Sequence, residues 1–134
     1  MQVDNLVAVV TLAALLVYFW IAFRVGGFRV KHKIVAPAVA GHPEFERAYR
    51  VQLNTLEWLP LFLPSLWLFA YYWSAPIAAA IGVVWIVGRI LYAISYVQDP
   101  TKRGPGFMMQ GISTGVLLLG SLGKAVALLV MHGL

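Results

Sequence analysis

The chain has 134 residues, of which 61% are hydrophobic and 11% are charged, and it carries a net charge of +5. A soluble domain is about half apolar and about one quarter charged, so the composition excludes an ordinary soluble protein. The absence of cysteine excludes disulfides and a protein-borne thiol nucleophile, so any sulfur chemistry must use a thiol carried by a substrate. The basic residues lie at the ends of apolar runs, and we therefore expect membrane topology rather than a nucleic-acid partner to explain them.

Four apolar runs have the length of about 20 residues that crosses a bilayer. They predict an all-α integral membrane protein, with residues 1–134 forming a single domain that folds as a four-helix bundle of up-down topology. Residues 1–5 contain no lysine or arginine, so the first run lacks the basic start of a cleaved signal peptide and is expected to remain as a helix. The helices are expected at about residues 4–25, 44–72, 76–97 and 105–131.

The connections between the runs differ in charge. The first connection, residues 24–42, is basic, the second is uncharged, and the third, residues 98–106, holds Lys102 and Arg103. Because positive residues in short loops remain on the cytoplasmic side, the first and third connections are expected there, with both termini opposite. The absence of a basic tail after residue 134 and of targeting features in the first helix favours a bacterial inner membrane as the host.

The segment 43–58, PEFERAYRVQLNTLEW, carries polar groups into the apolar run that follows it. Arg50, Asn54 and Glu57 are spaced i, i+4 and i+7, which puts them on one face of a helix. Gln52 lies about 200° away from Arg50 at about 100° per residue. This helix therefore has two polar faces at membrane depth, of which one can face its own bundle and the other requires a second partner.

Ionisable residues inside a span cost at least a few kcal/mol unless they are paired or hydrated. At a rise of about 1.5 Å per residue, Glu57 lies about 18 Å and Arg89 about 12 Å from the same membrane surface. These depths allow an ion pair that would clamp the second helix to the third. The alternative is that the same residues contact a ligand.

Five polar residues are expected to lie between the level of Glu57 and Arg89 and the cytoplasmic surface. Together with Arg29 and Gln52, these residues are expected to line a pocket for a small anionic or zwitterionic ligand, since guanidinium groups bind carboxylates and Glu57 suits an ammonium group. The alternative is that arginines at helix ends serve as lipid anchors. The group comprises Arg50, Asn54, Tyr92, Tyr96 and Arg103.

Histidine and tryptophan are two further residue types that can contact a ligand. His32 and His42 are expected in a loop and His132 at the opposite end, so no metal site is predicted. Trp58, next to Glu57, is a candidate contact for a ligand. The other tryptophans of the spans are expected to face lipid or the membrane interface: Trp20, Trp67, Trp73 and Trp85.

The segment PEFERAYRVQLNTLEWLPLFLPSLW, followed by GRILYAISY at 88–96 and by Arg103, resembles the MAPEG family, the membrane-associated proteins in eicosanoid and glutathione metabolism. The pattern ERxYRxQxNxxE from Glu46 to Glu57 carries the resemblance, which covers the whole four-helix plan. It is nearest the branch of leukotriene-C synthase, the type 2 and 3 microsomal glutathione transferases and the lipoxygenase-activating protein.

The resemblance implies a homotrimer that binds glutathione, as co-substrate and without a metal, between neighbouring subunits near the cytoplasmic side. Arg29 and Gln52 would come from the neighbouring subunit, and Arg103 matches the arginine that activates the glutathione sulfur. A nearby guanidinium favours the thiolate, which is the nucleophile. One subunit would supply the remaining ligands: Arg50, Asn54, Glu57, Tyr92 and Tyr96.

The sequence departs from the synthase at the pocket rim. Trp58 stands where the synthase has a tyrosine, and Val30 stands where it has a second arginine, beside the one that Arg29 matches. The loss of one hydroxyl contact changes the shape of the rim. These two changes leave the expectation of glutathione binding in place. They do not, however, allow the lipid substrate of the synthase to be assigned to this protein.

The resemblance implies a membrane-bound glutathione transferase, with glutathione peroxidase activity as a further expectation, acting on hydrophobic or lipid electrophiles. Two alternatives remain open. One is a non-catalytic membrane protein that presents lipid to a partner, which would have no need of a thiol-activating arginine. The other is a small multidrug transporter, which would require Glu57 to lie in the membrane without a cationic partner.

Overall fold

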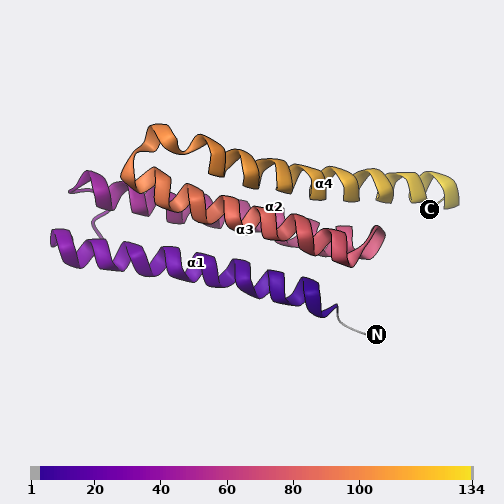
Figure 1. The fold of residues 1–134 in the computed structure, drawn as a ribbon, viewed down its shortest axis with the longest axis horizontal. Helices are drawn as coiled ribbons and strands as arrows, with labels where there is room; N and C mark the ends of the chain where they lie inside the picture. Colours follow the sequence, from indigo (N-terminus) through magenta and orange to yellow (C-terminus); the bar gives the residue numbers. More distant parts are fainter. Residues whose placement is uncertain (1–3, 134) are drawn as a thin grey trace.

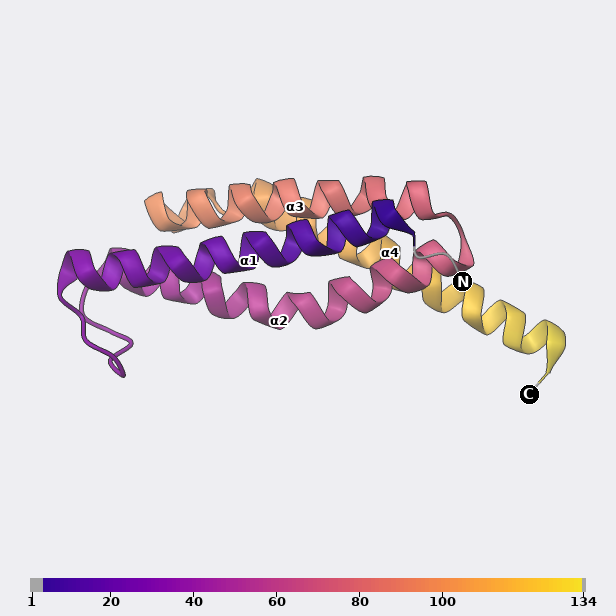
Figure 2. The same ribbon diagram turned by 90° about the horizontal axis from the view of Figure 1, so that it is seen from below.

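The computed structural model describes residues 4–133, and four long helices account for most of them (Figure 1). Successive helices run in opposite directions side by side, which confirms the predicted up-down four-helix bundle (Figures 1 and 2). Both described chain ends lie at one end of the bundle, and the connections 33–42 and 99–103 lie at the other. The helices are α1 (Asn5–His32), α2 (Pro43–Tyr72), α3 (Ala75–Gln98) and α4 (Gly104–His132), and a short 3-10 helix η1 (Pro100–Lys102) precedes α4.

Three of these helices, α1, α3 and α4, are long and apolar enough to cross a membrane, so the chain is a multi-pass integral membrane protein. The fourth span expected in α2 does not reach the same apolar content within the described residues, although α2 is 30 residues long and lies beside the others. Its ionised residues and its internal prolines, Pro60 and Pro64, explain the difference. The helix continues through both prolines and is bowed about its middle (Figure 2).

The first helix is longer than predicted. It continues to His32 instead of ending near residue 25, and it passes through Gly26 and Gly27. Glycine inside a helix costs about 1 kcal/mol relative to alanine, so packing must compensate. Val25 is buried against α2 and α3, and the Arg24 guanidinium donates to the Ala93 carbonyl at 3.3 Å. The sequence pattern of glycines and charges predicted a loop because it contains no information about this packing.

The core contains a fully buried tryptophan that the sequence placed at the lipid boundary. Trp85 is 0% exposed, and its ring stacks on that of Phe62 with the ring centroids 4.1 Å apart. The prediction of a lipid-facing Trp85 is therefore wrong. The i, i+4 relation to the buried Arg89 explains the outcome, since both side chains lie on the face of α3 that packs inward.

The backbones of α3 and α4 approach closely where two glycines meet. A methyl group at Gly106 would lie 2.5 Å from the backbone nitrogen of Tyr92 and 2.7 Å from the carbonyl oxygen of Gly88. Only hydrogen fits between these backbones. The contact fixes the start of α4, and with it Arg103, against the part of α3 that carries Tyr92 and Tyr96.

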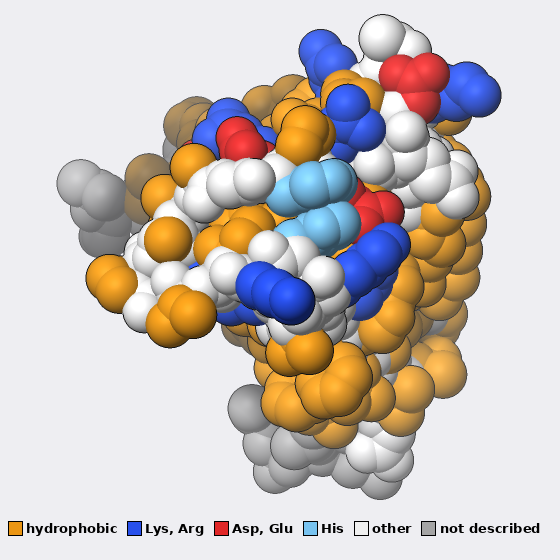
Figure 3. Space-filling model, turned by 90° about the vertical axis from the view of Figure 1, so that its left-hand side faces the viewer, with side chains coloured by type: hydrophobic (Ala, Val, Ile, Leu, Met, Phe, Trp, Pro, Cys, Tyr) orange, Lys and Arg blue, Asp and Glu red, His pale blue; other side chains and the backbone are white. Residues whose placement is uncertain are grey.

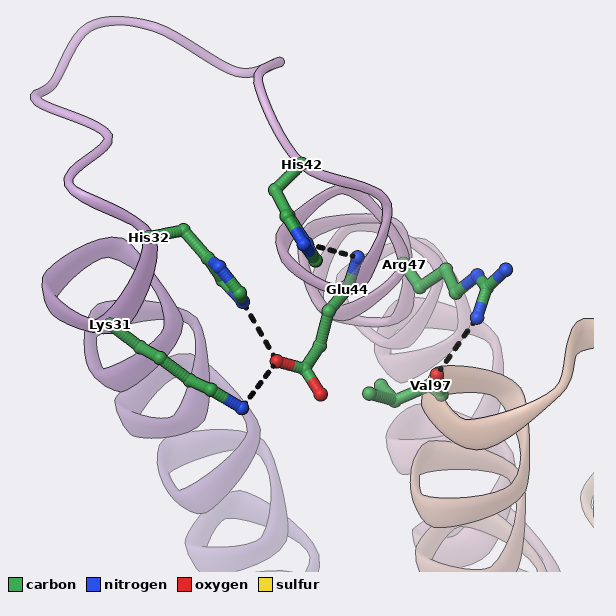
Figure 4. A network of polar contacts seen from close by, with 6 residues as sticks. All are labelled: Lys31, His32, His42, Glu44, Arg47 and Val97. Carbon is green, nitrogen blue, oxygen red and sulfur yellow. Dashed lines mark hydrogen bonds and ion pairs between the residues drawn. The ribbon is translucent and has the colours of Figure 1, made fainter.

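Side chains of opposite charge join α1 to α2 at the end of the bundle that carries the connections 33–42 and 99–103. Figure 3 shows charged side chains and histidines gathered on this end, with hydrophobic side chains along the flanks. The Glu44 carboxylate accepts from Lys31 Nζ at 2.9 Å and from His32 Nε2 at 2.8 Å (Figure 4). The hydrogen bond from Lys31, followed by that from His32, lowers the pKa of the Glu44 carboxyl from its ordinary value. The His32 and His42 rings stack at 3.6 Å, and together these contacts join the two ends of the connection 33–42.

Gly106→Ala is expected to destabilise the bundle by about 1–3 kcal/mol, because the methyl group meets backbone that cannot move aside. The thermal unfolding midpoint of the purified protein in detergent measures the effect. The control is Gly123→Ala on the same helix, where an added methyl group meets open space, so the midpoint should be at or above that of wild type. Equal midpoints for both variants would contradict the close approach.

Glu44→Gln is expected to remove a pH-dependent contribution to stability. Because the pKa of the Glu44 carboxyl is lowered in the folded protein, its contribution is complete above the ordinary value of 4.5 and is lost as the pH falls through the lowered value. The difference in unfolding midpoint between wild type and variant should thus shrink as the pH is lowered from 7 to 3. Glu46→Gln makes the same charge change without an ion pair among the described residues, and its midpoint should follow the wild-type pH profile. A Glu44→Gln difference that is constant with pH would refute the assignment.

Candidate functional site

A polar pocket of about 310 Å³ lies between α2, α3 and the start of α4. It is near the end of the bundle that carries the connections, since Arg103 directly precedes α4 there. The pocket brings together five of the residues predicted from the sequence. Its lining comprises Arg50, Asn54, Tyr92, Tyr96, Arg103 and Phe107.

Each wall of the pocket is supplied by a pair of residues one helical turn apart. Arg50 and Asn54 project from one face of α2, and Tyr92 and Tyr96 project from one face of α3 with their ring centroids 5.5 Å apart. Arg103 occupies the position before α4, where its guanidinium donates to the Pro100 carbonyl at 2.8 Å. The pocket is therefore built on three rigid helices, and the short connection 99–103 sets the position of its last cation.

Phe107 was not predicted, and it closes the pocket from the side of α4. Its ring lies 5.8 Å from that of Tyr92 and, edge to face, 5.8 Å from that of Trp58. The spacing i, i+4 from Arg103 could have identified it, because residues with this spacing share a helix face. Trp58 does not line the pocket itself, but it lies behind Phe107, which places an aromatic pair beside the polar groups.

The electrostatic character of the pocket is cationic. Two guanidinium groups and two phenol hydroxyls line it, and its lining contains no carboxylate. The Asp99 carboxylate accepts from the Thr101 hydroxyl at 2.8 Å and from the Thr101 backbone nitrogen at 3.0 Å, and these two bonds lower the pKa of the Asp99 carboxyl. Because arginine side chains only donate, the arrangement suits a ligand that is rich in acceptors and carries negative charge.

The ion pair between Glu57 and Arg89, one of the two alternatives that the sequence left open, is not formed among residues 4–133. Arg89 is 0% exposed, and its Nη1 donates to Asn54 Oδ1 at 2.7 Å and to Thr55 Oγ1 at 3.4 Å. Glu57 is exposed on α2, and no ion pair of Glu57 is found within residues 4–133. Arg89 is bound instead by Asn54 and Thr55, which lie nearer to the face of α2 that α3 covers.

Three other predicted residues lie outside the lining of the pocket. Arg29, near the end of α1, donates to the Ala38 carbonyl at 2.7 Å, and its guanidinium lies 4.7 Å from the centroid of the Phe45 ring. Gln52 is half-buried and Glu57 is exposed. The predicted polar residues therefore fall into two sets. One set lines the pocket of a single chain, and the other set, Arg29, Gln52 and Glu57, lies elsewhere on that chain.

The histidines at the connection 33–42 take part in other contacts. Across residues 4–133, no three His, Asp or Glu side chains are grouped in a way that could hold an ion. The His42 Nδ1 instead accepts from the Glu44 backbone nitrogen at 3.1 Å and so begins α2. The polar pocket is therefore the candidate site.

Comparison with known proteins identifies relatives of this chain. The chain is 46% identical over 115 residues to an uncharacterized protein of Synechocystis sp., a match that covers 86% of this chain and 84% of that protein. It is 40% identical over 121 residues to microsomal glutathione S-transferase 2 of Homo sapiens, covering 90% of this chain and 82% of the human protein. It is 37% identical over 98 residues to leukotriene C4 synthase of Cavia porcellus, covering 73% and 65% of the two chains.

The family assignment agrees with the helical plan and with the position of the pocket. Residues 7–123 match the pattern of one family, and this range includes all the residues that line the pocket. The first two relatives named above match over more than four fifths of their own length. The chain therefore belongs to the MAPEG family of multi-pass integral membrane proteins.

Proposed function

We propose that the protein is a membrane-bound glutathione transferase that acts on hydrophobic or lipid electrophiles, with peroxidase activity toward lipid hydroperoxides as a related reaction. The observation that carries the proposal is the pocket in which Arg50, Asn54, Tyr92, Tyr96 and Arg103 meet. Glutathione has two carboxylates and several carbonyl oxygens, which match a lining of guanidinium, amide and phenol groups. The names of the two relatives, a glutathione S-transferase and leukotriene C4 synthase, support the same class of enzyme.

The role we assign to Arg103 is to stabilise the glutathione thiolate. A free thiol has a pKa of about 8.5, and a neighbouring guanidinium lowers it, which raises the fraction of the nucleophilic form at neutral pH. Arg103 is exposed, and among residues 4–133 its guanidinium donates only to the Pro100 carbonyl, so its remaining donors are available to a ligand. With an epoxide as substrate, the thiolate forms a carbon–sulfur bond, the carbon–oxygen bond breaks, and the released oxygen takes a proton.

The apolar substrate is proposed to arrive from the bilayer. Phe107 lines the polar pocket and is itself exposed at the start of α4, with Trp58 packed on its edge. This aromatic pair is the point at which the pocket meets the apolar flank of the bundle. The proposed orientation places the two loop connections, and the polar part of the ligand, on the cytoplasmic side.

We further propose that the site is completed in a homotrimer. Gln52 and Arg29 lie outside the pocket of their own chain, which suits residues that contact glutathione in a neighbouring subunit. Glu57 shares the face of α2 that carries Arg50 and Asn54, and its exposed carboxylate is available to the ammonium group of glutathione. Partners are thus two copies of the same chain, membrane lipid and a hydrophobic small molecule.

Arg103→Ala is expected to lower the rate of conjugation of glutathione to 1-chloro-2,4-dinitrobenzene by about 100-fold, the cost of losing one donor that stabilises developing or fixed negative charge. The pH profile of the remaining rate should move to higher pH, since the thiol returns toward its ordinary pKa. Thiolate absorbance on addition of glutathione provides a direct reading.

The matched control is Lys102→Ala, which removes one positive charge at the adjacent, exposed position outside the pocket lining. It should retain the wild-type rate and pH profile. A wild-type protein that neither binds nor conjugates glutathione would refute the transferase, and lipid presentation to a partner would then be the function to test.

Mixing two inactive variants is expected to restore activity if the sites lie between subunits. Chains with Arg50→Ala and chains with Gln52→Ala each lack one side of the site. When they are coexpressed, some interfaces combine an intact Arg50 with an intact Gln52 from the neighbour, and these should conjugate glutathione. The control mixes the two proteins after separate purification, without subunit exchange. Activity no higher than that of the separate variants would contradict a site shared between chains.

A further inference from the structure

A buried arginine directly behind the pocket has no assigned role in the reaction. Arg89 is 0% exposed, and its Nε and Nη2 atoms have no hydrogen-bond partner among residues 4–133. No carboxylate in this part of the chain forms an ion pair with it. A buried cation without a counter-ion is costly, and apolar side chains of similar size would serve helix packing at least as well. A contribution beyond packing is needed to explain its presence.

The single short hydrogen bond of Arg89 determines the orientation of a pocket residue. Its Nη1 lies 2.7 Å from the Asn54 side chain. A guanidinium carries donors only, so the atom of Asn54 that faces it must be the carbonyl oxygen Oδ1. The amide nitrogen Nδ2, bonded to the same carbon as Oδ1, is then left for the pocket that Asn54 lines.

Arg89 also touches the second wall of the pocket. Its guanidinium carbon lies 4.8 Å from the ring centroid of Tyr92, which lines the pocket from α3, and 5.6 Å from that of the buried Trp85. Such contacts between a cation and an aromatic face are stabilising when they are desolvated. One buried side chain thus contacts a pocket residue on each of two helices.

We propose that Arg89 is a positioning residue, which holds Asn54 with its amide nitrogen toward the pocket so that Asn54 donates to an anionic or carbonyl acceptor of the ligand. The inference rests on the proposed function, in which the ligand is glutathione. Arg89 itself does not touch glutathione. With Asn54 held in this orientation, the inner part of the pocket presents a hydrogen-bond donor. The guanidinium groups of Arg50 and Arg103 on the same lining are donors as well.

The decisive variant is Asn54→Asp, with glutathione binding measured by isothermal titration calorimetry in detergent. The carboxylate keeps the acceptor for Arg89 and supplies the missing counter-ion, so the unfolding midpoint should be at least that of wild type. It lacks the amide donor, so the dissociation constant for glutathione should rise at least about tenfold. A folded Asn54→Asp protein that binds glutathione as tightly as wild type would overturn the inference.

A double-mutant cycle separates positioning from a general structural role. Arg89→Gln should raise the dissociation constant about tenfold in the wild-type background, and should add little in the Asn54→Ala background, where no amide remains to be oriented. Arg89→Lys, which keeps a donor, should recover part of the affinity. An equal loss in both backgrounds would show that Arg89 acts on the fold and would refute positioning.

Thr55→Val serves as the control within the same buried network. It removes the 3.4 Å contact of Arg89 but keeps the bond to Asn54, so glutathione affinity should stay within about twofold of wild type. A tenfold loss in this variant would contradict the inference, because Thr55 does not line the pocket. If the wild-type protein itself binds no glutathione, the proposed function fails, whereas unaltered binding in Asn54→Asp defeats only the role of Arg89.

Discussion

The need to satisfy polar groups inside an apolar bundle governs this structure. The helix α2 carries Arg50, Asn54 and Thr55 on faces that its neighbours cover or that border the pocket, and water is scarce at that depth. The structure meets the requirement in part by bringing Arg89 of α3 against Asn54, although two nitrogens of Arg89 keep no partner among residues 4–133, and by capping the pocket with the start of α4. A site thus arises where the helices cannot be entirely apolar.

The glycine contact between α3 and α4 sets the dimensions of that site. Backbones that approach through Gly88 and Gly106 bring Phe107 to the ring of Tyr92, and Arg103 lines the same pocket as Tyr96. The connection between the two helices is a single turn of 3-10 helix, stabilised by the Asp99 carboxylate. Close packing and a short connection therefore act together to hold one cation at the mouth of the pocket.

Much of the fold and of the site could be predicted from the sequence, because both follow from periodicity. The spacing of Arg50 and Asn54 on α2, and the depth of Tyr92 and Tyr96 within the third predicted span, put these residues in one predicted pocket. The predictions that were wrong depend on how the helices pack against one another. The partner of Arg89, the burial of Trp85 and the continuation of α1 through Gly26 depend on which neighbouring side chain is nearest, and a single sequence does not contain that distance.

The bond between Asn54 and Arg89 bears on how the protein enters a membrane. The helices α2 and α3 are joined only by Trp73 and Ser74, so they form a hairpin. Inserted alone, α3 would expose a guanidinium to hydrocarbon, and α2 would expose an unpaired amide. The hairpin is the smallest unit in which each group finds the other, and this favours insertion of the two helices together, as one step of biogenesis.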